Sequence, residues 1–97
     1  MLIVGGVFEV EPDDREAFIA ARHDMMRRSR AEPGCLEYTF AADPLEPGRV
    51  LLYERWESQE ALDAHLEALG QVPQPQSPAP TSMSIVVYEV ASERTLV

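Results

Sequence analysis

The sequence has few of the residues that mark disulfide-bonded, metal-binding or nucleic-acid-binding proteins. Only one cysteine occurs in 97 residues, so no internal disulfide can form, which is compatible with a reducing compartment. The two histidines lie far apart and match no metal-ligand spacing, so we expect no metal site. The sequence contains eight basic and seventeen acidic residues. This balance argues against binding to nucleic acid or to an anionic membrane surface.

Long apolar segments and targeting signals are also missing. No stretch is long and apolar enough to span a bilayer. The N-terminus opens with a strand-like run and shows no basic region followed by a cleavage site, so we expect a cytoplasmic protein. No phosphate-binding loop or nucleophile elbow follows Gly5 and Gly6. The length suits a single domain, residues 1–97, with one core.

What the sequence does contain is a regular series of strand and helix patterns. Strands rich in β-branched and aromatic residues are predicted at 1–10, 35–42, 49–57 and 83–91. Unbroken helices are predicted at 15–30 and 59–70 from apolar residues at helical spacing. Cys35 begins a strand and is expected to be a small buried apolar residue. Residues 71–81 carry four prolines and predict an extended connector. This connector is either a functional segment, such as a lid or a subunit-spanning arm, or a flexible insertion without a role.

The order β-α-β-β-α-β predicts an α+β, ferredoxin-like domain with a four-stranded antiparallel sheet and both helices on one face. In a monomer such strands have one apolar and one polar face. The last strand is instead apolar on both, with Met83, Ile85 and Val87 on one side and Val86, Tyr88 and Val90 on the other. Because soluble monomers rarely expose large apolar patches, we predict a two-fold partner packed sheet against sheet, a dimeric α+β barrel.

Three runs of residues resemble one known family. They are Glu32-Pro-Gly-Cys-Leu-Glu-Tyr, Leu52-Tyr-Glu-Arg-Trp-Glu-Ser and Glu60-Ala-Leu-Asp-Ala-His-Leu. With the turn at Pro12, they are similar to the antibiotic biosynthesis monooxygenase family over nearly the whole chain. The resemblance implies a dimeric α+β barrel with a cavity in each subunit between sheet and helices. It implies no single reaction, since the superfamily holds cofactor-independent monooxygenases of aromatic polyketides and quinols, haem-degrading enzymes and members without known activity.

His65 and Trp56 are the candidate catalytic residues. His65 lies on the apolar stripe of the second predicted helix and therefore faces the sheet. A neutral imidazole there can serve as general base on a phenol or hydroquinone, whose anion then reacts with dioxygen. The alternative is a core histidine bonded to a carbonyl or to a neighbouring acid. Trp56 either walls a pocket for a flat aromatic ligand or seals the sheet against a helix.

Seven further residues are expected to line the substrate pocket: Gly6, Phe18, Arg22, Met25, Tyr38, Leu62 and Leu66. Arg22 is a candidate for binding an anionic ligand, and the alternative is a surface ion pair with a nearby glutamate. Gly6 either opens space beneath Trp56 or accommodates a neighbouring side chain. It stands where haem-degrading members carry an asparagine, and the spacing from Trp56 to His65 is one residue shorter than theirs. We therefore expect no cofactor, with haem a minor possibility.

These features predict a cofactor-independent monooxygenase acting on a small aromatic phenol, quinol or polyketide-like substrate. The alternative is a dimeric ligand-binding or stress-response protein that uses the same cavity without turnover. A third interpretation is a scaffold protein whose cavity has collapsed around a buried His65. The sequence does not assign Tyr38, Tyr53 and Tyr88 to the cavity side or to the dimer side of the sheet.

Overall fold

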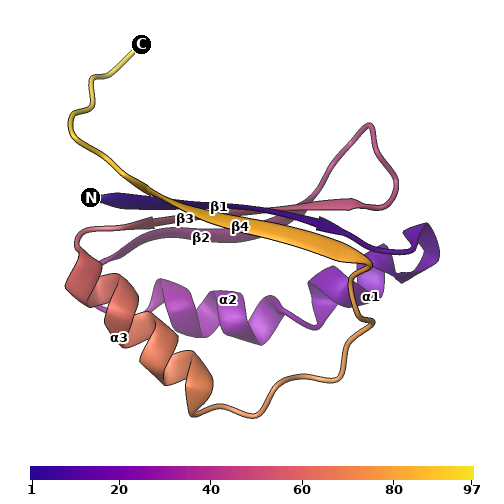
Figure 1. The fold of residues 1–97 in the computed structure, drawn as a ribbon. Coiled ribbons are helices and arrows are strands. Elements are labelled where there is room, and N and C mark those ends of the chain that lie inside the picture. Colours follow the sequence, from indigo (N-terminus) through magenta and orange to yellow (C-terminus); the bar gives the residue numbers. More distant parts are fainter.

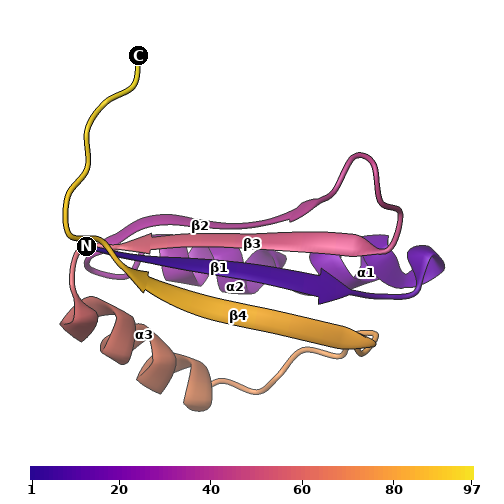
Figure 2. The same cartoon turned by 45° about the horizontal axis from the view of Figure 1, so that its top comes forward.

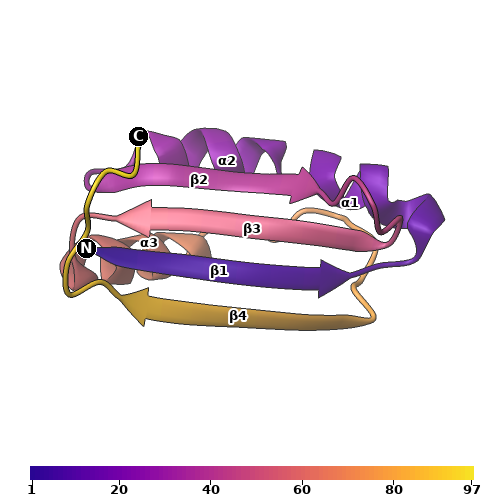
Figure 3. The same cartoon turned by 90° about the horizontal axis from the view of Figure 1, so that it is seen from above.

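A computed structural model describes residues 1–97 as a four-stranded antiparallel sheet with all helices on one face (Figure 1). The strands are β1 (Leu2–Glu9), β2 (Cys35–Ala42), β3 (Arg49–Trp56) and β4 (Ser82–Glu89). The helices are α1 (Arg15–Ala20), α2 (His23–Arg30) and α3 (Gln59–Gly70), and a 3-10 turn, η1 (Pro12–Asp14), precedes α1. The sheet order β2-β3-β1-β4 is that of the ferredoxin-like α+β fold, as predicted (Figure 3). None of the helices has the length and hydropathy needed to cross a membrane.

Alternation along the strands gives the sheet a covered face and an open face. In β1 and β3 every second residue is buried against the helices. The core there consists mainly of large apolar side chains: Leu2, Val4, Phe8, Val50, Leu52, Trp56, Phe18, Phe40 and Leu62. The opposite face carries no helix, and its apolar side chains are half exposed: Leu51, Tyr53, Val86 and Tyr88. Tyr38 is the tyrosine that faces the helices.

The prediction of one unbroken helix over 15–30 is wrong, because this segment forms two helices, α1 and α2, with a break at residues 21–22. In a continuous helix the Phe18 carbonyl would accept the Arg22 amide. Here the amide of Arg22 bonds the carbonyl of Ile19, at 3.0 Å, while the Arg22 side chain donates Nη1–H to the Phe18 carbonyl at 2.8 Å. The guanidinium thus replaces the backbone donor, and the chain turns at Arg22.

The proline-rich connector joins the end of α3 to the start of β4 within one chain (Figure 2). It has no helix or strand of its own, as its four prolines predict. Ser77 accepts a hydrogen bond from Arg22 at 2.9 Å, and the amide of Thr81 bonds the Glu9 carbonyl at 2.7 Å. The connector is therefore tied to the helical layer in its middle and to the sheet at its end.

Cys35, expected to be buried, is only half-buried at the start of β2. Its neighbour Gly34 closes the turn between α2 and β2 with a φ of +83°, which L side chains rarely adopt. The Gly34 carbonyl accepts the Glu57 amide at 2.9 Å, and a Cβ on Gly34 would lie 2.5 Å from the Cβ of Ala61. This glycine therefore allows the turn to pack against the first turn of α3.

We predict that Gly34→Ala lowers the free energy of unfolding by about 1–3 kcal/mol, because it adds both backbone strain and a clash. Gly70→Ala is the matched control, since nothing lies within 4 Å of a Cβ there. It should leave the stability unchanged or raise it by up to about 1 kcal/mol. Urea denaturation checks both variants, and equal stabilities for the two would contradict this account of the turn.

Candidate functional site

A cavity of about 280 Å³ lies between the covered face of the sheet and helices α2 and α3. Its lining is mostly apolar: Val4, Phe8, Met25, Tyr38, Phe40, Leu52, Leu62, Leu66, Leu69, Ile85 and Val87. Three polar side chains complete the wall, namely Arg22, Glu54 and His65. Leu66 of α3 and Ile85 of β4 are both at least half exposed, at 55% and 50%, so the cavity opens between these two elements. An apolar cavity with a few converging polar groups is the usual form of a small-molecule site.

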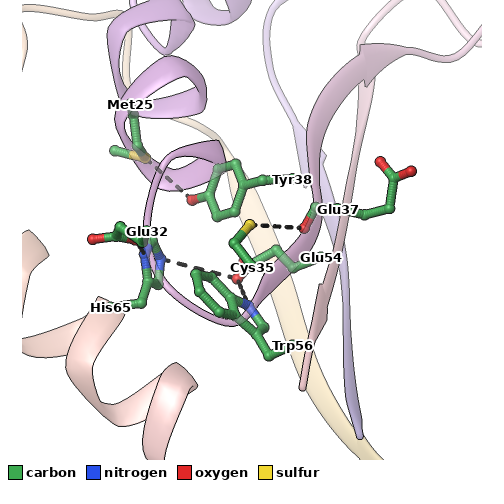
Figure 4. A network of polar contacts seen from close by, with 8 residues as sticks. All are labelled: Met25, Glu32, Cys35, Glu37, Tyr38, Glu54, Trp56 and His65. Atoms are coloured by element: carbon green, nitrogen blue, oxygen red, sulfur yellow. Dashed lines mark hydrogen bonds and ion pairs between the residues drawn. The ribbon is translucent and has the colours of Figure 1, made fainter. Parts of the chain in front are cut away.

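Glu54 reaches the cavity because β3 alternates. It lies two residues from both Leu52 and Trp56, on the covered face, and is only 5% exposed. The indole Nε1–H of Trp56 donates to Glu54 Oε1 at 2.9 Å (Figure 4). Burial raises the pKa of Glu54 above its ordinary value, and the Trp56 hydrogen bond and nearby His65 oppose this only in part. The strand therefore presents a buried carboxyl group whose proton is held more tightly than in water.

His65 is positioned by α3, whose start is fixed by a side-chain cap. Ser58 accepts the amide of Ala61 at 3.1 Å, and His65 lies one turn beyond, facing the sheet and 2% exposed. Its Nδ1 lies 2.6 Å from Glu32 Oε1, and its Nε2 lies 3.9 Å from Glu54 Oε1 (Figure 4). The imidazole is thus held between two carboxyl groups.

The two ring nitrogens of His65 have different surroundings. An acceptor nitrogen would repel a carboxylate oxygen at 2.6 Å, so we assign the proton to Nδ1 as donor to Glu32. In the neutral imidazole with this tautomer, Nε2 keeps its lone pair. His65 also borders a second, outer cleft that is lined by Glu32, Glu57 and Glu60 among others. The imidazole therefore forms part of the partition between an apolar cavity and an acidic, solvent-facing surface.

Two aromatic rings support this imidazole. The ring centroid of Trp56 lies 4.6 Å from that of His65, and the Tyr38 centroid lies 5.2 Å away. Burial raises the pKa of the Tyr38 phenol, so its hydroxyl stays protonated; it donates to the sulfur of Met25 at 3.3 Å. Both rings restrict the orientation of His65 without offering a competing base.

Of the residues expected at the site, six line the cavity: His65, Arg22, Met25, Tyr38, Leu62 and Leu66. Trp56 does not, because it is fully buried and contacts His65 from within the core. Phe18 is also fully buried and lies beneath the guanidinium of Arg22, 3.5 Å from its ring centroid. Gly6 opens no space beneath Trp56. A Cβ there would lie 3.0 Å from the Cβ of Leu52, so Gly6 accommodates that neighbour.

The surface ion pair considered for Arg22 is wrong. No carboxylate lies within 4.0 Å of its guanidinium, whose partners are the Phe18 carbonyl and the Ser77 hydroxyl. The side chain is half-buried, and burial lowers its pKa from the ordinary value. Arg22 is therefore a cation of the cavity wall without an acidic partner.

Glu54 and Glu32 are the polar residues that the sequence analysis missed. The alternation of β3 contained the signal for Glu54, since it stands between Leu52 and Trp56 on the covered face. Glu32 meets His65 from 33 positions away in the sequence, and no local pattern predicts that contact. No group of three or more His, Cys, Asp and Glu side chains is arranged to hold a metal ion.

The fold and the cavity define a ferredoxin-like α+β domain with an apolar cavity between sheet and helices. The family model for antibiotic biosynthesis monooxygenase matches residues 1–70. The chain belongs to this family. The match ends with α3, so the proline-rich connector and β4 lie beyond it.

Individual relatives show how far the likeness extends. An uncharacterized protein of Synechocystis, sll1783, is 39% identical over 66 residues, which are 68% of this chain and 45% of that protein. The chain thus spans less than half of that relative. The Mycobacterium tuberculosis protein named "Putative monooxygenase Rv0793" is 38% identical over 58 residues, 60% of this chain and 56% of that one.

Solved structures extend the likeness to the whole fold. The structure of Rv0793 superposes with a TM-score of 0.72 at 29% identity, covering 97% of this chain and 98% of that chain. The crystal structure of "a putative antibiotic biosynthesis monooxygenase from Deinococcus radiodurans" superposes with a TM-score of 0.79 at 21% identity, covering 100% of this chain and 99% of that chain. At that identity the second likeness concerns the fold alone.

We predict that the stability of the protein falls as the pH rises from about 4.5, the ordinary pKa of a glutamate, through the raised pKa of Glu54. In this window the folded protein still binds the Glu54 proton while the unfolded chain has released it, so rising pH favours unfolding. Glu54→Gln keeps the acceptor for Trp56 and removes the ionisation. Thermal denaturation between pH 4.5 and 9 should show a weaker decline for this variant, whereas parallel curves would contradict a raised pKa.

Proposed function

We propose that the protein is a cofactor-independent monooxygenase acting on a small hydroxylated aromatic compound. The observation that carries this proposal is the placement of His65, whose Nδ1 is held by Glu32 at 2.6 Å while its ring borders an apolar cavity. A base in a water-poor cavity with a fixed tautomer meets the geometric requirement for general base catalysis. The cavity, about 280 Å³, suits a ligand of one or two rings.

His65 acts first, as the base that takes the phenolic proton of the substrate onto Nε2. The imidazolium formed is then stabilised by Glu32 at Nδ1 and by Glu54 near Nε2. Glu32 is partly exposed, with 25% of its side chain accessible, and borders the outer cleft. It offers a route by which the proton leaves to solvent without crossing the cavity. The apolar walls keep the phenolate poorly solvated and hence easily oxidised.

The phenolate then reacts with dioxygen without an external reductant. It gives one electron to dioxygen, and the resulting superoxide and aryloxyl radicals combine at a ring carbon to form a peroxide anion, which takes the proton back from His65 Nε2 and becomes a hydroperoxide. His65 removes the proton of that ring carbon, the O–O bond breaks, and the departing hydroxide takes up this proton and leaves as water. The balance is phenol plus dioxygen to quinone plus water, with one atom of the dioxygen in each product. The substrate supplies all the electrons, so the step needs no flavin or metal.

A ligand-binding protein without turnover is the alternative, and one observation favours it. The contact between His65 and Glu32 is what a structural histidine paired with an acid also makes. The cavity beside His65 serves either function, so oxygen consumption is the measurement that separates them.

We also propose that the protein works as a homodimer through the open face of its sheet. Leu51, Tyr53, Val86 and Tyr88 are between 37% and 57% exposed there, and no helix of the chain covers them (Figure 1). A second copy related by a two-fold axis presents the same apolar surface and covers it.

The proposed reaction predicts oxygen consumption with phenols and hydroquinones in the absence of added metal or flavin. His65→Ala should lower the rate by about 10²–10⁴-fold, because the general base is removed. His23→Ala is the matched control, since His23 is exposed on α2 and should leave the rate unchanged. An oxygen electrode measures the rate, and circular dichroism verifies that each variant is folded.

Isotope labelling distinguishes the reaction class. With ¹⁸O₂ the quinone should carry one labelled oxygen and the other should appear in water. Hydrogen peroxide as product, with no label in the quinone, would indicate an oxidase instead. Equal rates for wild type and His65→Ala would contradict the role of His65, and no uptake with any substrate would favour the binding protein.

The dimer proposal predicts that light scattering gives twice the mass of one chain. Val86→Arg places a charge on the open face and should yield monomers. Met83→Arg is the control on the same strand, because Met83 faces the helix side and is 63% exposed. A wild-type monomer at micromolar concentration, or an unaltered Val86→Arg dimer, would contradict the proposal.

A further inference from the structure

Arg22 stands out among the cavity residues because its guanidinium bonds the Phe18 carbonyl and the Ser77 hydroxyl through Nη1 but has no counter-ion, and the proposed proton transfer does not use its charge. It is the one basic side chain of the wall apart from the imidazole, in a protein of net charge −9. No acidic side chain neutralises it within 4.0 Å. A half-buried cation facing an apolar space without a counter-ion is unusual, since buried charges are normally paired.

The guanidinium is held rigidly while part of it stays free. One face lies over the ring of Phe18, 3.5 Å from the centroid. Both of its hydrogen bonds, to the Phe18 carbonyl and to the Ser77 hydroxyl, come from Nη1. Nη2 and Nε make no hydrogen bond within the chain. The edge of the guanidinium formed by Nε and Nη2 carries two parallel N–H donors, which is the arrangement with which arginine binds a carboxylate.

The two ends of the cavity differ in charge. Arg22 lies 5.7 Å from the ring centroid of Phe40, and Phe40 pairs with Leu52, whereas Glu54 and its partner Tyr38 lie two residues further along the strands. The two residue pairs are roughly 7 Å apart along the strand direction. An anionic group is attracted to the Arg22 end of the cavity, where the guanidinium is the only fixed positive charge of the wall.

We infer that the cavity selects aromatic acids, with Arg22 binding the carboxylate and the hydroxyl-bearing end of the ring directed to His65. The inference rests on the proposed function for the reaction but not for the binding. It makes Arg22 the residue that determines substrate class and orientation. Hydroxylated benzoates or naphthoates, rather than neutral phenols, are then the substrates.

Matched pairs of acid and amide test the binding without turnover. The probes are 4-hydroxybenzoate with 4-hydroxybenzamide and 2,5-dihydroxybenzoate with its amide, titrated anaerobically by calorimetry. Wild type should bind each acid about 10–100-fold more tightly than its amide, as a charge-assisted bidentate contact provides. In Arg22→Gln the preference should fall to within about threefold while amide affinity is kept, which reports an intact cavity.

The control is Arg27→Gln, which makes the same change of charge at an exposed position on α2, where Arg27 pairs with Asp24. It should keep the preference of wild type. If Arg22→Gln loses amide binding as well, Arg22→Lys is the second test variant, since lysine keeps the positive charge and lacks the two parallel N–H donors of the guanidinium. A reduced acid preference in Arg22→Lys supports the inference. No preference in wild type, or an equal one in Arg22→Gln, overturns it.

Failure of the inference and failure of the proposed function give different results. Acid-selective binding that depends on Arg22, without oxygen uptake, would retain the ligand class and reject the reaction. Oxygen uptake that is faster with neutral phenols than with the matched acids would retain the reaction and reject the role of Arg22.

Discussion

The contact between His65 Nδ1 and Glu32 Oε1, 2.6 Å long, is the interaction on which the organisation of the site depends. It joins the middle of α3 to the turn that follows α2, so it fixes the distance between the two helices that cover the sheet. It also fixes the imidazole tautomer, which directs the lone pair of Nε2 toward Glu54 and the cavity. A single hydrogen bond thus links the packing of the helical layer with the chemistry available to a ligand.

A second constraint is the placement of buried charge at both ends of a small apolar space. Glu54 is held by Trp56 at one end and Arg22 lies on Phe18 at the other, so the two ends of the cavity carry different ionisable groups. Each group is costly to bury, and Arg22 has no acid beside it. Stability alone would favour apolar replacements at such positions, and we therefore interpret the charges as serving a ligand.

The fold was largely predictable from the sequence because strand composition and the helical spacing of apolar residues are local patterns. The inward position of His65 followed from the helical period in the same way. Glu54 was predictable in principle from the alternation of β3 but was overlooked as a charged residue between Leu52 and Trp56. Glu32 and the break at Arg22 were not, because each arises from a contact made by one side chain, and no periodic pattern encodes such a contact.

The most direct test of the account is the tautomer of His65, measured by ¹⁵N NMR with labelled histidine at pH 8.5, where an ordinary imidazole is neutral. The chain has two histidines, and His23→Ala leaves only the signals of His65. The account predicts a protonated Nδ1 bonded to Glu32 and an Nε2 with a free lone pair. A protonated Nε2 with a bare Nδ1 would contradict it, because the imidazole would then have no base to offer to the cavity.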